Sequence, residues 1–170
     1  MFGGSNDAGE IDHIPIDDDG EYCHCGNVGC LETIASAWAL QRKAKQIVDT
    51  GGQVQFRRVP NPKPQINELC EMPAAGDVLA RNILTKAERA IGRALAISAS
   101  LFDPEVIVLG GTLSAAETYE PLITPIRESF QTLTAHRTSQ PIRIETSALR
   151  EDAMFLGAAE LVFTEMLGSD

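Results

Sequence analysis

Hydrophobic side chains recur three and four positions apart in four stretches of the chain, the spacing typical of helices that bury one face. The stretches are 31–49, 77–102, 114–133 and 150–167. Asp77 stands where a side-chain oxygen could cap the second helix. Residues 91–102 are mostly small and apolar, so we expect the second half of this longest helix to be deeply buried.

Two runs rich in β-branched residues, EVIVLGG at 105–111 and PIRIETS at 141–147, predict strands. IDHIPI at 11–16 alternates in character and predicts a short strand, which Pro15 confines to an edge or a strand end. DDDG at 17–20 predicts a turn, 51–65 with three prolines predicts a linker, and 66–72 predicts a short helix. Because helices and strands alternate, the predicted fold class is α/β.

Length and charge narrow the classes of function. The chain has 170 residues, enough for one domain with a real core, and its formal net charge is −10. An acidic chain without a large lysine or arginine cluster argues against direct contact with nucleic acid. No apolar run approaches a membrane span, and the first residues lack the features of a signal peptide. We therefore expect a cytoplasmic protein with no membrane partner and with reduced thiols.

Three cysteines lie within eight positions, in the spacing C-x-C-x4-C at Cys23, Cys25 and Cys30. Gly26 and Gly29 allow a tight loop in which three thiolates face one point. Thiolates suit zinc, which needs four ligands, whereas the alternative is a set of unpaired cysteines without metal. The candidates for the fourth ligand are His13, His24 and Cys70.

His13 is favoured as the fourth ligand, because the predicted turn at 17–20 would fold it back over the cysteine loop. His24 would be sterically awkward between two ligating cysteines, and Cys70 lies beyond the predicted linker. With four protein ligands no position stays open for water, so the pattern predicts a structural zinc rather than a catalytic one.

The same residues resemble a family signature. GEIDHIPID at 9–17 followed by CHCGNVGCLE at 23–32 is similar to the signature of the ROK family (repressors, open reading frames and sugar kinases), roughly G-E-x-G-H followed by C-x-C-G-x-x-G-C-x-E. AAGDVLA at 74–80, LFDP at 101–104 and EVIVLGG at 105–111 are also similar to that family. The resemblance covers most of the chain.

The resemblance implies a fold, a metal site and a ligand. The fold would be the second lobe of an actin-like (ribonuclease H-like) ATPase fold with a zinc-binding loop. Its structural zinc ligands would be His13, Cys23, Cys25 and Cys30. The positions that match contacts to sugar hydroxyls are Glu10, His13 and Glu32, and in the family's kinases the turn at Gly110 and Gly111 lies near the nucleotide.

The family's phosphate loop, D-x-G-x-T, and its Asn-Asp pair with the catalytic Asp have no match in this chain. We therefore expect residues 1–170 to form a single second lobe, with the zinc and sugar loop at 10–32 and the linker at 51–65. The first lobe and any DNA-binding domain would be absent. No catalytic residue is assigned, and no activity is expected from this chain alone, because phosphoryl transfer needs a base and a phosphate cradle.

Two functions fit this expectation. The chain is predicted to be the sugar-sensing part of a transcriptional regulator that contacts DNA only through an absent N-terminal domain. The alternative is half of an ATP- and magnesium-dependent sugar kinase of the glucokinase, fructokinase or N-acetylhexosamine kinase type. Three departures from the family pattern bear on this: Asp12 replaces a Gly, Thr112 replaces a third Gly of the kinases, and TIASAWAL at 33–40 replaces their Ser-Gly. The last two favour the regulator.

The expected partners follow from these functions. A monosaccharide or sugar phosphate would be the effector, and an apolar face exposed by the missing lobe would favour a homo-oligomer. A zinc-stabilised assembly module without a ligand is a third alternative.

Overall fold

The computed structural model describes residues 3–5, 7–49, 69, 77–110, 116–135, 141–149 and 152–168. The predicted linker at 51–65 and, apart from Leu69, the predicted helix at 66–72 lie outside these residues. Helices and strands alternate as predicted, which confirms the α/β class. The elements are η1 (Ile11–His13), α1 (Leu31–Ala35), α2 (Ala37–Asp49), α4 (Val78–Phe102), β1 (Val106–Leu109), α5 (Ala116–Thr134), β2 (Arg143–Thr146) and α6 (Ala153–Leu167).

Helix α4 is the centre of the fold and has the predicted boundaries. Asp77 caps it, since its Oδ1 accepts hydrogen bonds from the backbone N–H groups of Leu79 and Ala80, both at 2.9 Å. The helix ends at Asp103, which adopts a left-handed conformation with φ of 44° just before Pro104. Small residues let its neighbours approach closely. A Cβ on Gly92 would lie 2.7 Å from the Cβ of Ser129 on α5.

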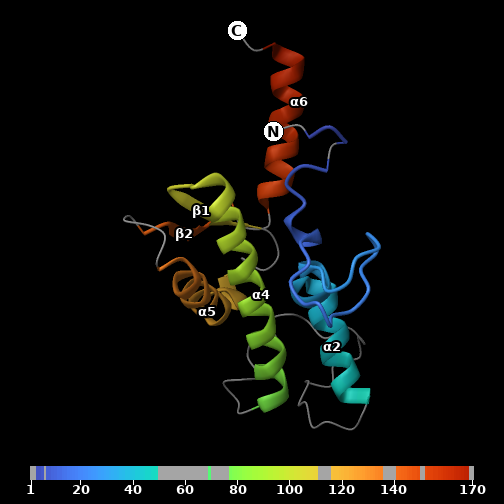
Figure 1. Cartoon of the computed structure of the whole chain (residues 1–170). Coiled ribbons are helices and arrows are strands. Elements are labelled where there is room, and N and C mark those ends of the chain that lie inside the picture. Colours follow the sequence, from blue (N-terminus) through green and yellow to red (C-terminus); the bar gives the residue numbers. More distant parts are fainter. Residues whose placement is uncertain are drawn as a thin grey trace.

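Helix α4 packs on two sides, between the N-terminal elements and the strands (Figure 1). One apolar cluster joins it to α1 and α2, and a second joins it to α5 and β2. Ile91 packs against both clusters, so the two halves of the core are continuous. The first cluster includes Leu31, Ile34, Leu40 and Leu84, and the second includes Leu95, Ile123, Ile126, Phe130 and Ile144.

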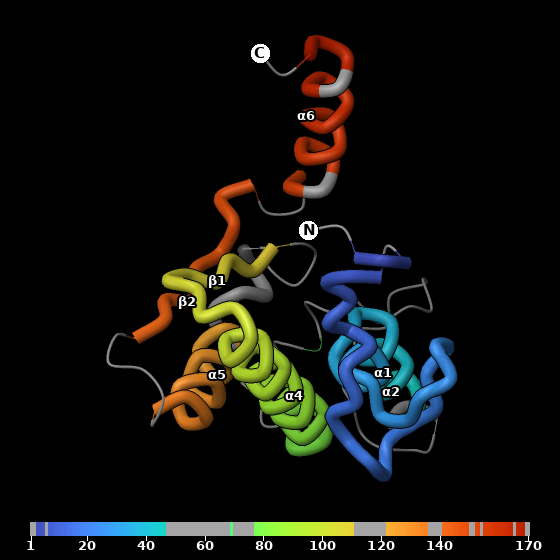
Figure 2. The backbone as a smooth tube through the Cα atoms, turned by 45° about the horizontal axis from the view of Figure 1, so that its top comes forward, coloured from blue at the N-terminus to red at the C-terminus, as the bar shows by residue number. Residues whose placement is uncertain are grey.

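The two strands are parallel and hydrogen-bonded, with Val106 opposite Arg143 and Leu109 opposite Thr146. Helix α5 lies between them in the chain and packs beside α4 (Figure 2). Ile144 of β2 is buried against this helix pair, whereas Val108 of β1 leaves 57% of its surface exposed. The carboxyl end of β1 leads to Gly110.

The predicted strand at 11–16 is wrong. Residues 11–13 form a turn of 3-10 helix, because the backbone N–H of His13 donates to the Glu10 carbonyl and that of Ile14 donates to the Ile11 carbonyl, both at 3.2 Å. Only Pro15 forms a bridge, antiparallel to Cys30. Pro15 thus pairs like a strand residue, but the residues before it form a 3-10 turn.

The predicted single helix at 31–49 is interrupted. Ser36 is extended, with φ of −67° and ψ of 156°, and separates α1 from α2. Its Oγ accepts a hydrogen bond from the backbone N–H of Ala39 at 3.2 Å, which is the bond of an N-terminal cap. The side chain of Ser36 therefore starts α2 instead of continuing α1.

Helix α6 projects away from the rest of the fold in both views (Figures 1 and 2). Its large apolar side chains are exposed, with Leu161 at 70% and Met166 at 78%. Among the described residues, no helix combines the length and apolar character needed to cross a membrane. A helix so apolar on its surface needs another surface to cover it.

Candidate metal centre

A short backbone pairing holds η1 beside the cysteine loop. The N–H of Ile16 donates to the Gly29 carbonyl at 2.8 Å, and the N–H of Leu31 donates to the Ile14 carbonyl at 3.0 Å. Gly29 has φ of 64°, and any Cβ there would collide with the Asp17 carbonyl oxygen. Only glycine fits this crossing of the chain, which places the end of η1 over the cysteines.

Four ligand atoms converge at this point. His13 Nδ1 and the sulfurs of Cys23, Cys25 and Cys30 lie within 4.8 Å of one another. The sulfurs of Cys25 and Cys30 are 3.6 Å apart, and the sulfur of Cys23 is 3.5 Å from His13 Nδ1. A tetrahedral zinc with bonds of about 2.0–2.3 Å sets its ligand atoms about 3.5–3.8 Å apart. The cluster could therefore bind a metal such as zinc.

The other predicted candidates for the fourth ligand do not join the cluster. His24 instead lies near Trp38, with ring centroids 6.4 Å apart. Cys70 is outside the described residues. Glu10, Asp12 and His13 also bring ligand atoms within 4.8 Å of one another, but exposed acidic groups are common without a metal. Soft thiolates with an imidazole are the better zinc set.

The pKa values of the three thiols are not shifted in the same direction. The Cys23 thiol donates to Glu32 Oε1 at 2.9 Å, and this bond, together with burial, raises the pKa of Cys23 to about 12. Burial raises the pKa of Cys30, whereas the backbone N–H of Asn27 is the main cause that lowers the pKa of Cys25. A metal that binds all three thiolates must displace the tightly held protons of Cys23 and Cys30.

Glu32 connects the cysteine cluster to a cavity of about 390 Å³. It lies in the first turn of α1, and its Oε1 is 3.8 Å from His13 Nδ1. The same cavity is also lined by Asp12 and by Gly110. Apolar side chains from four helices complete the wall, among them Leu31, Trp38, Ile91, Leu95, Leu122 and Ile126.

The structure thus brings together some of the predicted site residues. Glu32 and Gly110 share the cavity, whereas His13 belongs to the cysteine cluster, Glu10 lies next to His13, and neither of the two lines the cavity. Gly111 is outside the described residues. Sequence reasoning noted Asp12 only as a departure and missed Trp38. Asp12 could have been found as an acidic side chain next to His13. Trp38 could have been found as the chain's single tryptophan, six positions after Glu32.

The fold and site define an α/β protein with a cysteine- and histidine-bearing loop beside an acidic-rimmed cavity. The model of the ROK family matches residues 1–165, and the chain belongs to this family. It is 36% identical over 145 residues to the DNA-binding transcriptional dual regulator NagC of Escherichia coli strain K12, covering 84% of this chain and 34% of NagC. It is 30% identical over 155 residues to a glucokinase of Thermotoga maritima, and the alignment covers 90% of this chain and 48% of the glucokinase.

A solved structure of a member of the same family has a similar fold. The ROK hexokinase of Thermus thermophilus superposes with a TM-score of 0.78 at 28% identity, covering 99% of this chain and 52% of the hexokinase. The chain therefore spans about a third of NagC and about half of each kinase. The predicted family and fold class are both confirmed.

The pKa differences predict an order of thiol reactivity. The thiolate is the nucleophile, so at pH 8 the exposed Cys25 of the metal-free chain should react with iodoacetamide much faster than the buried Cys23. Labelling of Cys23 should rise only as the pH approaches its raised pKa of about 12, and Glu32→Gln should speed it by weakening the anionic acceptor. Peptide mass spectrometry after timed labelling measures this order. Equal rates at Cys23 and Cys25 would contradict the assigned hydrogen bond.

Proposed function

We propose that this chain is the sugar-sensing part of a ROK-family transcriptional regulator, with a structural zinc in the cysteine loop. One observation carries the proposal: Glu32 lies in the first turn of α1, directly after the cluster residue Cys30, and also lines the cavity. A metal in the cluster would therefore fix the same turn that presents the carboxylate. The greater identity to NagC than to the glucokinase, 36% against 30%, favours the regulator.

The proposed ligand is a monosaccharide or a sugar phosphate, since two of the similar proteins are named as sugar kinases. Glu10 and Glu32 are acceptors that suit sugar hydroxyl donors. The Nδ1 atom of His13 faces the Cys23 sulfur. A metal bound at Nδ1 would leave the proton on Nε2, which could then donate a hydrogen bond to a ligand. When bound, the zinc supplies a cross-link and takes no part in a reaction. A thiolate cannot donate, so metal binding would also release Glu32 from Cys23.

A second candidate is one half of a sugar kinase that uses ATP and magnesium. Gly110 favours it, because this strand end faces the same cavity as Glu32 and could lie near a nucleotide. Such a function needs the other half of the fold, which the hexokinase possesses in its remaining length. A regulator would likewise contact DNA through a domain outside this chain.

Zinc content tests the metal proposal. The purified chain should hold about one zinc, because four ligand atoms converge at one point. Cys25→Ser should lose the zinc and lower the melting temperature, since structural metal binding contributes folding free energy. Cys70→Ser is the matched control and should keep the metal. Elemental analysis gives the stoichiometry, and full zinc retention in Cys25→Ser would rule out this ligand set.

Sugar binding tests the ligand proposal in the complete protein, with both lobes. Glu32→Gln should keep the zinc but weaken binding of the effector about tenfold or more, because a charged hydrogen bond contributes about 1.5–3 kcal/mol. Isothermal calorimetry with a panel of monosaccharides and their phosphates measures the affinity. Glu128→Gln on the exposed surface of α5 is the control. Unchanged affinity in Glu32→Gln would remove Glu32 from the site, even with zinc in place.

We further propose that the chain forms a homo-oligomer through α6. The exposed apolar side chains continue along the whole helix, from Phe155 at 75% to Leu167 at 81%, and a second copy would cover them. Light scattering should give a mass above that of one chain, and Leu161→Glu should restore the monomer while Glu160→Gln should not. A wild-type monomer at every accessible concentration would contradict self-association.

A further inference from the structure

A second cavity, of about 550 Å³, lies between α2, α4 and the loop at 17–21. Among the described residues, it shares no lining residue with the cavity at Glu32, so we treat it as a separate site. Its volume suits a small metabolite. The charged side chains around it are Asp17, Asp19, Glu21, Lys43 and Lys86.

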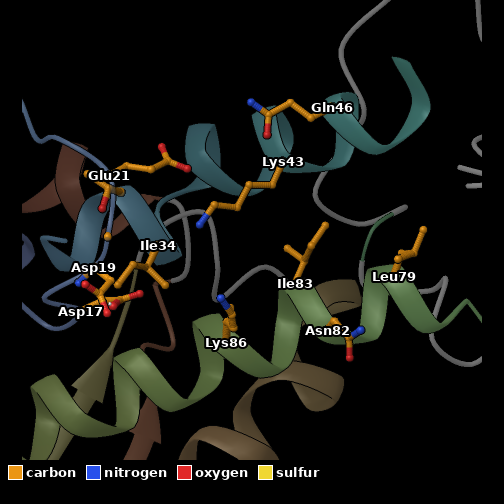
Figure 3. A pocket seen from close by; sticks show the side chains of 12 residues that line it. Asp17, Asp19, Glu21, Ile34, Lys43, Gln46, Leu79, Asn82, Ile83 and Lys86 are labelled. Atoms are coloured by element: carbon orange, nitrogen blue, oxygen red, sulfur yellow. Dashed lines mark hydrogen bonds between the residues drawn. The ribbon is translucent and has the colours of Figure 1, made fainter. Parts of the chain in front are cut away.

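Two lysines face each other across this cavity. Figure 3 shows Lys43 reaching in from α2 and Lys86 reaching in from α4, so that their ammonium groups point toward one another. Among the described residues, neither ammonium group has a carboxylate within 4.0 Å. Lys43 is half-buried, and burial lowers its pKa; the charges of Glu21 and Asp17 act against this shift, whereas those of Arg42 and Lys86 act with it. Two cations so placed repel each other, and an anion bound between them would relieve this repulsion.

The wall formed by the loop at 17–21 is acidic, but not all of its carboxylates are available. Glu21 is paired with Arg42, and Asp17 Oδ1 already accepts the backbone N–H of Asp19 at 3.2 Å. Within the part of the chain that the structure describes, the remaining oxygens of Asp17 and Asp19 have no hydrogen-bond donor, so they could accept from hydroxyl groups. They would also repel a ligand that is anionic along its whole length. The cavity therefore has one anion-binding end and one hydroxyl-binding end.

We propose that this cavity binds a small polyhydroxylated anion, whose phosphate or carboxylate group lies between Lys43 and Lys86 and whose hydroxyl groups donate to Asp17 and Asp19. Ammonium groups bind oxyanions through charge-assisted hydrogen bonds, which are the stronger kind. The acidic wall selects against inorganic polyanions and against nucleic acid. This site goes beyond the proposed sugar sensing at Glu32 and is independent of the metal.

Glycerol 3-phosphate is the simplest probe, because it joins one phosphate to two hydroxyl groups. The chain should bind it saturably in isothermal calorimetry and more tightly than methyl phosphate, which lacks the hydroxyls. Lys43→Gln and Lys86→Gln should each weaken binding about tenfold or more, the loss expected for one charge-assisted hydrogen bond. Lys45→Gln, an exposed lysine on the same helix that does not line the cavity, is the matched control.

Asp19→Asn separates the two ends of the cavity. It should weaken glycerol 3-phosphate binding, because a hydroxyl acceptor loses its charge, while it should strengthen methyl phosphate binding by removing repulsion. A gain for both probes would overturn the hydroxyl-binding end. No saturable binding, or an equal loss in Lys45→Gln and Lys43→Gln, would overturn the site itself. Neither result would affect zinc content or sugar binding at Glu32, since no described residue lines both cavities.

Discussion

The loop from Glu10 to Cys30 must hold its shape with almost no hydrophobic core, since only Cys23, Gly29 and Cys30 are buried within it. Backbone hydrogen bonds between residues 14–16 and 29–31 close its base, but they leave the cysteine-bearing tip without apolar support. Segments too small to bury much surface are commonly fixed by a metal or a disulfide. The free cysteines at 23, 25 and 30 and His13 place four ligand atoms where a metal could fix the tip.

The same constraint extends into the rest of the fold through α1. Cys30 is the residue before this helix, and Glu32 lies in its first turn, so fixing the sulfur also fixes the carboxylate. Leu31 and Ile34 pack α1 onto α4, which continues into the second cluster with α5 and β2. Gly110 at the end of β1 thereby faces the cavity that Glu32 lines. One continuous helix thus sets the spacing between the metal loop and the strand end.

Local chemistry explains which features could be predicted from the sequence. The start of α4 could be predicted from Asp77, because its capping bond depends only on nearby backbone. The β-branched runs at 105–111 and 141–147 predicted both strands. The break between α1 and α2 at Ser36 could not be predicted, because the apolar spacing continues through it. The 3-10 turn at 11–13 could not be predicted either, because alternating residues also occur in such turns. The cysteine spacing and its glycines sufficed for the metal loop, whereas the Cys23–Glu32 bond and the Lys43–Lys86 approach depend on helices packing together.

X-ray absorption at the zinc edge measures the ligands of the metal in the purified, zinc-loaded chain. We expect three sulfur neighbours at about 2.3 Å and one nitrogen neighbour at about 2.0–2.1 Å. That result would place His13 with Cys23, Cys25 and Cys30 around one ion. A coordination shell dominated by oxygen and nitrogen would rule out the cysteine site, because it would put the metal at the acidic group of Glu10, Asp12 and His13 and leave the cysteine loop without its cross-link.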